Sequence, residues 1–125
     1  MIALRFTTNR NEESFTSEDQ VNKIQFNGLC VYDITSEVER MIEDDYTFEE
    51  AVSIIALRQV KFDNWHAQNT KGNFVIFNAD FIELERDNQD YLGNRAVIAK
   101  INNYTAFGQI DMQSEYYRCK SLELI

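Results

Sequence analysis

The sequence predicts a single domain of the α+β class over residues 1–125, with helices mainly in the first half packed on a mostly antiparallel sheet. Two observations predict this class. Helix-capping patterns and helical spacing of apolar residues are concentrated in the first half, whereas strand-like runs dominate the second half. The 125 residues include four glycines and no proline, and no repeated or low-complexity segment divides them into two domains.

The first half is predicted to contain two short strands and three helices. Residues 2–7 and 29–32 are rich in apolar and β-forming side chains, which favours strands. Capping boxes that begin at Ser17 and Thr47 predict the starts of two helices, and Thr35 is expected to cap another. Apolar residues at helical spacing define the expected buried faces of the second and third helices. These are Val38, Met41 and Ile42 in the helix after Thr35, and Phe48, Ala51, Val52 and Ile55 in the helix after Thr47.

The second half is predicted to consist mainly of strands. No helical period follows Val60, and Lys71-Gly72-Asn73 is expected to form a turn. Residues 81–84 fit a strand or a helix. The other expected strands comprise residues 74–77, 95–101, 104–110 and 115–124, with a turn at Asn102-Asn103 between the second and the third.

The chain is strongly acidic, with a net charge of −9 and a pI near 4.5. A field of this sign repels phosphate groups, so we expect no direct nucleic-acid binding and no association with anionic membranes. The first residues lack the basic region and apolar run of a signal peptide, and no apolar stretch approaches the roughly 18 residues of a membrane span. Cys30 and Cys119 are therefore expected to be free, buried thiols of a cytoplasmic protein.

The densest charge feature lies between Glu37 and Glu50, where seven acids accompany a single base, Arg40. One interpretation is a surface that imitates a phosphate backbone and occupies a basic nucleic-acid-binding protein. The other is a solvated helix face whose carboxylates favour the positive end of a helix dipole. The sequence leaves both interpretations open.

His66 is the single histidine of the chain and lies beside Trp65. A zinc site needs several ligands at short spacing, and no Cys-x-x-Cys pair is present, so no metal centre is expected. A nucleophilic pair of His66 with Cys30 depends on the two side chains meeting in space, which the local sequence does not decide. We expect His66 to be a surface or half-buried polar residue.

Three segments carry a resemblance to a known family. Gln113 and Glu115 form a Gln-x-Glu pair at the start of an expected late strand, where a period of two places both side chains on one face. Arg5-Phe6-Thr7 lies on the expected first strand, and Gly28 leads the expected second strand, which precedes a helix. The combination resembles mono-ADP-ribosyltransferases. Its spread along the chain is similar to small members from phages and mobile elements, including anti-CRISPR proteins with this fold.

The resemblance implies an ADP-ribosyltransferase-like fold, NAD as the cofactor and transfer of ADP-ribose to a protein partner. It implies that Glu115 is catalytic and lies over the ribose, and that Gln113 engages the acceptor. A carboxylate in that place would stabilise the oxocarbenium character that develops when the nicotinamide–ribose bond breaks. The residues that the resemblance assigns to NAD binding are Arg5 as a pyrophosphate clamp, Thr7, Gly28, Leu29, and Tyr32 as a stacking partner of nicotinamide.

Three functions follow from these observations and remain open at this level. The first is a small NAD-dependent ADP-ribosyltransferase that modifies a protein partner, with phage or mobile-element counter-defence as one setting. The second is a non-enzymatic acidic inhibitor that binds a basic host or nucleic-acid-binding protein through the Glu37 to Glu50 region. The third is a small structural or regulatory partner protein that has no active or ligand site and acts through an apolar surface.

Overall fold

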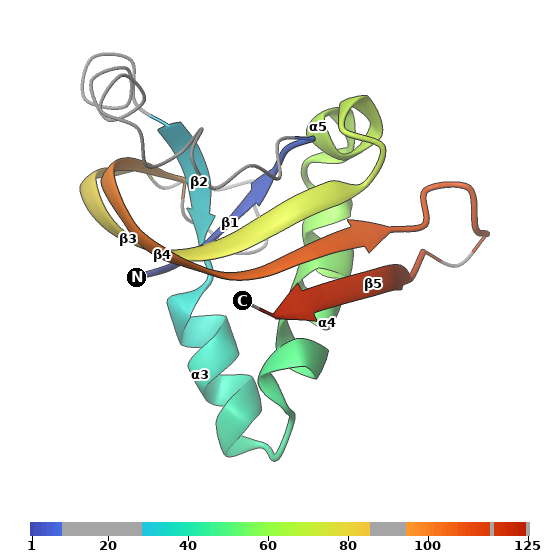
Figure 1. The fold of residues 1–125 in the computed structure, drawn as a ribbon, viewed down its shortest axis with the longest axis horizontal. Coiled ribbons are helices and arrows are strands. Elements are labelled where there is room, and N and C mark those ends of the chain that lie inside the picture. The colour runs from blue at the N-terminus through green and yellow to red at the C-terminus, as the bar shows by residue number, and fades with distance from the viewer. Residues whose placement is uncertain (9–28, 86–94, 116, 125) are drawn as a thin grey trace.

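The structure of the protein is a computed structural model (Figure 1) that describes residues 1–8, 29–85, 95–115 and 117–124. Of residues 29–30, 81–85, 95–105, 121 and 123–124 it describes only the backbone. The elements follow one another in the order β1 (Ile2–Phe6), β2 (Leu29–Asp33), α3 (Thr35–Glu43), α4 (Phe48–Val60), α5 (Asn64–Asn69), β3 (Asn73–Glu85), β4 (Arg95–Ile110) and β5 (Cys119–Leu124). The α+β class is confirmed. The helix expected after Ser17 lies outside the described residues.

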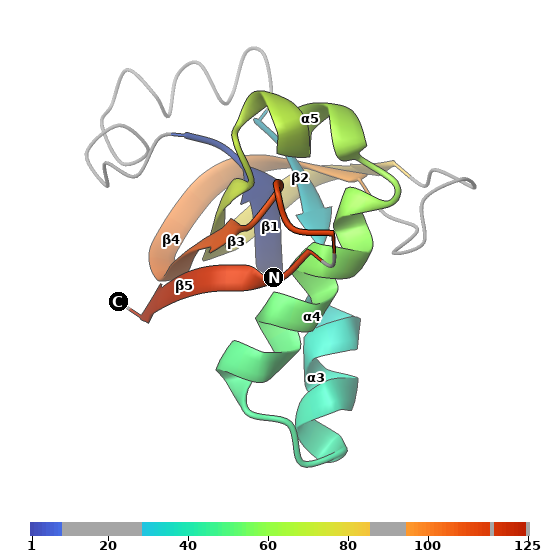
Figure 2. The same ribbon diagram turned by 90° about the vertical axis from the view of Figure 1, so that its right-hand side faces the viewer.

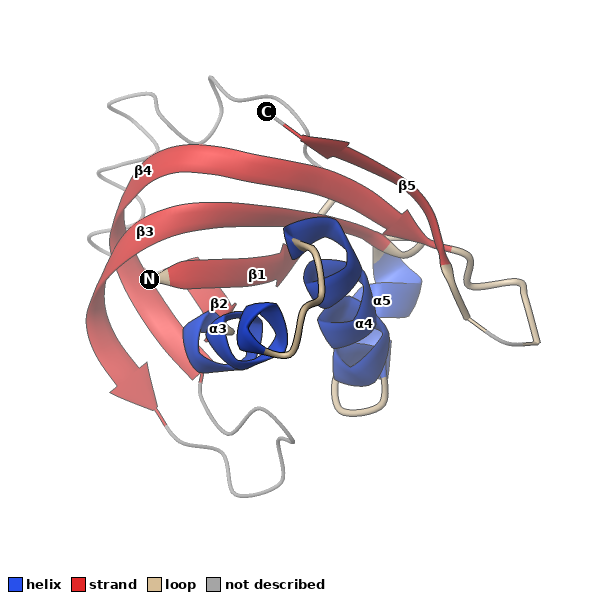
Figure 3. Cartoon of the chain, turned by 90° about the horizontal axis from the view of Figure 1, so that it is seen from below, coloured by secondary structure: helices blue, strands red, loops and turns tan. Residues whose placement is uncertain are grey.

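The five strands form one antiparallel sheet in the order β2-β1-β3-β4-β5. Strand β2 pairs with β1 on one side and with Arg95 to Ile98 of β4 on the other. The sheet therefore curls until β1, β3, β4 and β2 are joined in a ring of pairings, while β5 extends one side as an edge strand. Figure 1 and Figure 3 show the two longest strands, β3 and β4, bending along their length.

Each of the two long strands was expected to be two separate pieces. Residues 74–77 and 81–84 belong to the single strand β3. The turn expected at Asn102-Asn103 is wrong, because β4 continues through these residues and pairs Asn103 with Asn78. The register of this pairing shifts at Asn78/Ala79 and at other positions nearby. Irregularities of this kind bend a strand without ending it, so the polar residues mark a bend and not a chain reversal.

The other differences from the sequence predictions concern short segments. The last strand begins at Cys119 and not at Glu115. Helix α5 lies where no helix was expected, because its six residues include one buried residue, Ala67, and cannot display an apolar period. The turn at Lys71-Gly72 is confirmed, with φ angles of 55° and 78°. None of the helices in the described part of the chain is both long and apolar enough to cross a bilayer.

The starts of α3 and α4 differ in how well the sequence predicted them. The capping box of α4 is confirmed: the Thr47 hydroxyl accepts from the Glu50 N–H, and the Glu50 carboxylate accepts from the Thr47 N–H, each at 3.1 Å. Thr35 is not the cap of α3 but its first residue. Its hydroxyl accepts from the Ile2 N–H at 2.9 Å and donates to the Asp33 carboxylate at 2.7 Å. Thr35 therefore ties α3 to β1.

Apolar residues are buried on both sides of the sheet. The helix-facing side holds the larger cluster, where α3 and α4 pack together and against the sheet (Figure 2). The far side holds a second cluster, which consists of Ala3, Val31, Val75, Phe77, Ala79 and Phe107. Neighbours along a strand, such as Ala3 and Leu4, belong to different clusters, as the pleat of a strand requires. A residue can therefore be assigned to one side of the sheet from its position.

Gly108 lies opposite Phe74, and its lack of a side chain leaves room for the Phe74 ring. A Cβ atom at Gly108 would come within 2.3 Å of that ring. We expect Gly108→Ala to lower the free energy of unfolding, measured by chemical denaturation, by roughly 1–3 kcal/mol because it overpacks the core. In a Phe74→Leu background the same change should cost much less. An equal loss in both backgrounds would contradict this explanation.

Candidate functional site

Arg5 and Tyr32, two of the residues predicted to hold NAD, lie on different sides of the sheet. Tyr32 pairs with Leu4 and packs against the helix-facing cluster. Arg5 follows Leu4 along β1 and pairs with Val75, a member of the far-side cluster. Cross-strand partners point to the same side, and neighbours along a strand point to opposite sides. The sheet therefore separates these two side chains.

The remaining residues assigned to NAD are described only in part. Thr7 follows the end of β1, is half-buried, and its N–H donates to the Asn73 carbonyl at 3.0 Å. Leu29 begins β2 opposite Ile98, and its backbone alone is described. Gly28 lies outside the described residues. Their proposed contacts with NAD stay predictions.

The extended conformation expected around Gln113 and Glu115 is wrong. Residues 112–115 turn between β4 and β5, and both side chains are exposed. Asp111 organises this turn, because its carboxylate accepts from the Gln113 N–H at 3.1 Å and lies 3.8 Å from the Lys120 amine. Strands β3 and β4 stand between β5 and the strand that carries Arg5. The catalytic roles of Gln113 and Glu115 also stay predictions, without the extended geometry on which they were based.

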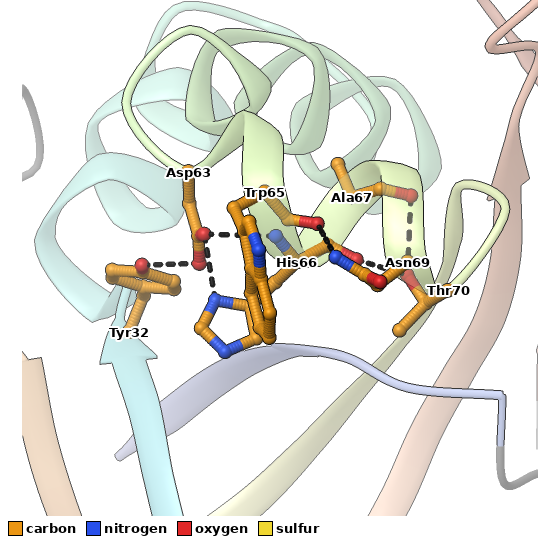
Figure 4. Close-up of polar contacts among 7 residues, drawn as sticks. All are labelled: Tyr32, Asp63, Trp65, His66, Ala67, Asn69 and Thr70. Carbon is orange, nitrogen blue, oxygen red and sulfur yellow. Dashed lines mark hydrogen bonds and ion pairs between the residues drawn. The ribbon is translucent and has the colours of Figure 1, made fainter.

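A polar cluster that the sequence did not predict centres on Asp63, at the start of α5 (Figure 4). The Tyr32 hydroxyl donates to Asp63 Oδ2 at 2.5 Å. The other carboxylate oxygen, Oδ1, lies 2.7 Å from His66 Nδ1 and accepts from the His66 N–H at 3.2 Å. The Asp63 side chain is only 10% exposed, so a largely buried carboxylate with both oxygens bonded joins α5 to β2.

The outer part of this cluster is an exposed pair of rings. Because His66 Nδ1 faces Asp63, the Nε2 atom is the ring nitrogen left for a further partner. The side chain of His66 is 51% exposed, which confirms its prediction as a surface polar residue. The Trp65 ring meets it edge-on, with 4.7 Å between ring centroids, and Trp65 is 67% exposed.

An aspartate that orients a histidine is an arrangement used by general bases, which act on a nearby nucleophile or water. The side chain of Cys30 is not described, so a pairing of Cys30 with His66, which the local sequence did not decide, is not tested. Within the described residues, no group of three or more His, Cys, Asp or Glu side chains is placed to hold a metal ion. The contacts of Asp63 that the structure does show serve to anchor α5.

Sequence reasoning missed Asp63 although part of the signal was present. An aspartate three residues before His66 fits a helix N-cap, and the Asp63 side chain does accept from the His66 N–H. The bond from Tyr32 joins residues 31 positions apart and has no sequence signal. Only the packing of α5 against the end of β2 brings these two side chains together.

Cys119 is a free, half-buried thiol at the start of β5. Its Sγ donates to the Ser53 carbonyl at 3.7 Å. Burial raises the pKa of the Cys119 thiol, and an interaction with the Ser53 side chain opposes this rise without cancelling it. The thiol therefore stays protonated at neutral pH and is a weak nucleophile.

The acids between Glu37 and Glu50 lie on a helical hairpin formed by α3, the turn after it and the first turn of α4. We call residues 37–50 the acidic hairpin. Glu37 lies in the first turn of α3, and Glu49 and Glu50 lie in the first turn of α4. Carboxylates at these N-terminal positions interact favourably with the helix dipole. The interpretation as a solvated helix face therefore explains this part of the cluster.

The end of α3 does not fit that interpretation. Glu43 is the last residue of α3, and Asp44 and Asp45 follow it directly, all of them exposed. Three carboxylates therefore adjoin the negative end of a helix dipole, where each is unfavourable. The start of α4 comes next, but it already carries two acids and its own capping box. Electrostatics alone does not account for these three residues.

The backbone of this turn is left-handed at Asp45. The Tyr46 N–H donates to the Met41 carbonyl at 3.0 Å and the Asp45 N–H to the Ile42 carbonyl at 3.1 Å, which together form a Schellman motif. Asp45 occupies its left-handed position, with a φ of 68°. Glycine adopts this conformation without strain, and Asp and Asn tolerate it better than most other residues. The backbone therefore accommodates an aspartate at this position, whereas the helix dipole disfavours its charge.

Two large apolar side chains are exposed among these acids. Ile42 is 47% exposed and Tyr46 is 42% exposed. The prediction that Ile42 is buried is wrong, because Val38 and Met41 supply the buried face of α3 and Ile42 lies beside that face. Figure 1 and Figure 2 both show the turn between α3 and α4 at the end of the molecule that extends away from the sheet.

The bond between Tyr32 and Asp63 is expected to stabilise the fold. Tyr32→Phe should lower the free energy of unfolding by about 1.5–3 kcal/mol, the range for a hydrogen bond to a charged group. In an Asp63→Ala background the same change should have almost no effect, because the acceptor is already gone. Tyr46→Phe, at an exposed position, is the matched control and should change stability little. Losses that simply add in the double variant would show that the two residues are not coupled.

Comparisons of this chain with protein-family models, with curated proteins and with solved structures find no match. The resemblance to ADP-ribosyltransferases therefore rests on the sequence segments alone, and the ADP-ribosyltransferase-like topology stays a prediction.

Proposed function

We propose that this protein is a non-enzymatic inhibitor that binds a basic, nucleic-acid-binding protein through its acidic hairpin. The observation that carries the proposal is the group of Glu43, Asp44 and Asp45 at the end of α3. Residues that oppose local structural preferences without a structural gain are candidates for function. These three carboxylates lie at the exposed end of the molecule, where a partner can approach them.

The apolar side chains of the hairpin support binding to a protein surface. Carboxylates at the rim of an interface steer a basic partner and select against acidic ones, but supply little affinity on their own. Apolar and aromatic side chains at the centre of an interface supply most of the affinity. Ile42 and Tyr46 are exposed among the acids of the hairpin and suit the second role. The hairpin thus combines both kinds of contact.

Replacing the three carboxylates with neutral amides tests this proposal. We expect Glu43→Gln/Asp44→Asn/Asp45→Asn to raise the free energy of unfolding by roughly 1–3 kcal/mol at low salt, since each acid at a helix C-terminus costs about 0.3–1 kcal/mol. The same variant, immobilised, should retain at least tenfold less basic protein from a bacterial lysate than the wild type. Duplex DNA should compete with the wild-type protein for what is retained, because both would occupy the same basic surface.

The matched control adds the same amount of positive charge elsewhere. Gln113→Lys/Glu115→Lys raises the net charge by as much as the triple variant does, on the exposed turn between β4 and β5. It should retain the captured proteins nearly as well as the wild type. Equal losses in the control and the triple variant, or retention that does not weaken with salt, would contradict a docking role for the hairpin.

NAD-dependent ADP-ribosyl transfer remains the competing prediction. Its support is the order of the Arg5, Gly28 and Gln113-Glu115 segments along the chain. The separation of Arg5 from Tyr32 by the sheet speaks against a single NAD site that uses both, although Gly28 lies outside the described residues.

A thermal-shift titration with NAD checks this competing prediction. A ligand that binds only the folded state raises the apparent stability, by about 2.7 kcal/mol at a concentration one hundred times its dissociation constant. The non-enzymatic proposal expects no shift at millimolar NAD. A clear shift that disappears in Arg5→Ala, together with labelling of a lysate by labelled NAD that is lost in Glu115→Gln, would favour the enzyme.

A further inference from the structure

A second exposed apolar surface lies at the other end of α4. We call it the α5 surface and define it as Lys61, Phe62, Trp65, His66 and Lys71. Trp65 is 67% exposed, more than any other large apolar side chain in the described part of the chain, and Phe62 is 44% exposed. Phe62 and Trp65 are three residues apart in the chain, and exposed aromatic side chains mark candidate docking sites because their burial contributes strongly to binding.

The α5 surface is held in place before any partner arrives. The side-chain amide of Asn69 donates to the Trp65 carbonyl at 2.7 Å, and the Thr70 hydroxyl donates to the His66 carbonyl at the same distance. At the other end of α5, Asp63 bonds to Tyr32 of β2 (Figure 4). A surface that is already ordered loses less conformational entropy when it binds.

The charge of this end of the molecule is opposite to that of the acidic hairpin. Residues 58–72 contain three bases and one acid, in a chain whose net charge is −9. The acid is Asp63, whose carboxylate is largely buried and already bonded. Lys61 and Lys71 are both exposed. The chain therefore carries an acidic apolar surface and a basic aromatic surface that complement each other.

These two surfaces cannot meet within one molecule. Helix α4 has 13 residues, and the acidic hairpin includes its first turn, whereas α5 follows its last residue. At 1.5 Å per residue the helix separates the two surfaces by about 20 Å. Figure 1 and Figure 2 both show the hairpin turn and α5 at opposite ends of the molecule. Their complementarity can be used only between molecules.

We propose that two copies of this chain associate head to tail, with the acidic hairpin of one copy docked on the α5 surface of the other. The proposal rests on the proposed function in one respect, that the hairpin is a docking surface. Ile42 and Tyr46 pack on Phe62 and Trp65, and the carboxylates of the hairpin face the two lysines. Such a contact is heterologous, so it leaves one surface of each kind free and allows a third copy to add.

The net charge of the chain does not forbid this contact. The net charges of two copies repel each other. The Debye length is about 8 Å at physiological ionic strength, so charges separated by several Debye lengths hardly interact. Opposite charges in contact are screened much less. Association should therefore be strongest at intermediate salt and weaker both at very low salt, where net repulsion extends farther, and at high salt.

Two variants that each disable one surface test the head-to-tail arrangement. The hairpin variant is Glu43→Lys/Asp44→Lys, and the α5 variant is Trp65→Ala/Lys61→Glu. Sedimentation velocity at concentrations up to roughly 1 mM should show association of the wild type and a monomer for each variant alone. An equimolar mixture of the two variants should form dimers and nothing larger, because one intact hairpin meets one intact α5 surface.

The mixture also shows that both variants are folded, since each must supply an intact surface. A wild type that stays monomeric over this range, or a variant that still associates by itself, overturns the proposal. A monomeric wild type that still retains basic proteins from a lysate would overturn self-association and leave the proposed function standing. A hairpin variant that loses self-association but still captures those proteins would overturn the proposed function and leave self-association standing.

Discussion

The double pairing of β2 is the constraint on which the rest of the structure depends. Strand β2 bonds to β1 along one edge and to the start of β4 along the other. The sheet can satisfy both pairings only if β3 and β4 bend, and the register shifts between these strands provide the bend. A flat sheet of the same strands would leave one edge of β2 without partners.

This constraint also sets the direction of the helices. Helix α3 starts two residues after β2 ends, and the Thr35 hydroxyl and the Ile34 N–H both bond to Ile2 of β1. The first residue of α3 is therefore fixed at the end of the two strands. The buried faces of α3 and α4 pack on each other and on the sheet, so the turn between them points away from the core. The acidic hairpin is exposed because of this anchoring.

Acidic and basic side chains are concentrated at different ends of the molecule, which the net charge alone does not show. The acids of the hairpin and the lysines beside α5 lie at opposite ends of one rigid helix. Asp63 belongs to the basic end in the sequence, but its carboxylate is only 10% exposed and its oxygens are bonded to Tyr32 and His66. A buried carboxylate with both oxygens bonded contributes to stability, whereas an exposed one is available to a partner.

The sequence by itself determined the α+β class, the turn at Gly72 and the capped start of α4, because each depends on residues within a few positions of one another. Only the tertiary structure decided that Asn102-Asn103 continues a strand, that Ile42 is exposed and that Arg5 and Tyr32 lie on different sides of the sheet. It also decided the contact of Asp63 with Tyr32. These outcomes depend on pairing and packing between residues far apart in the chain, for which local periodicity carries no information.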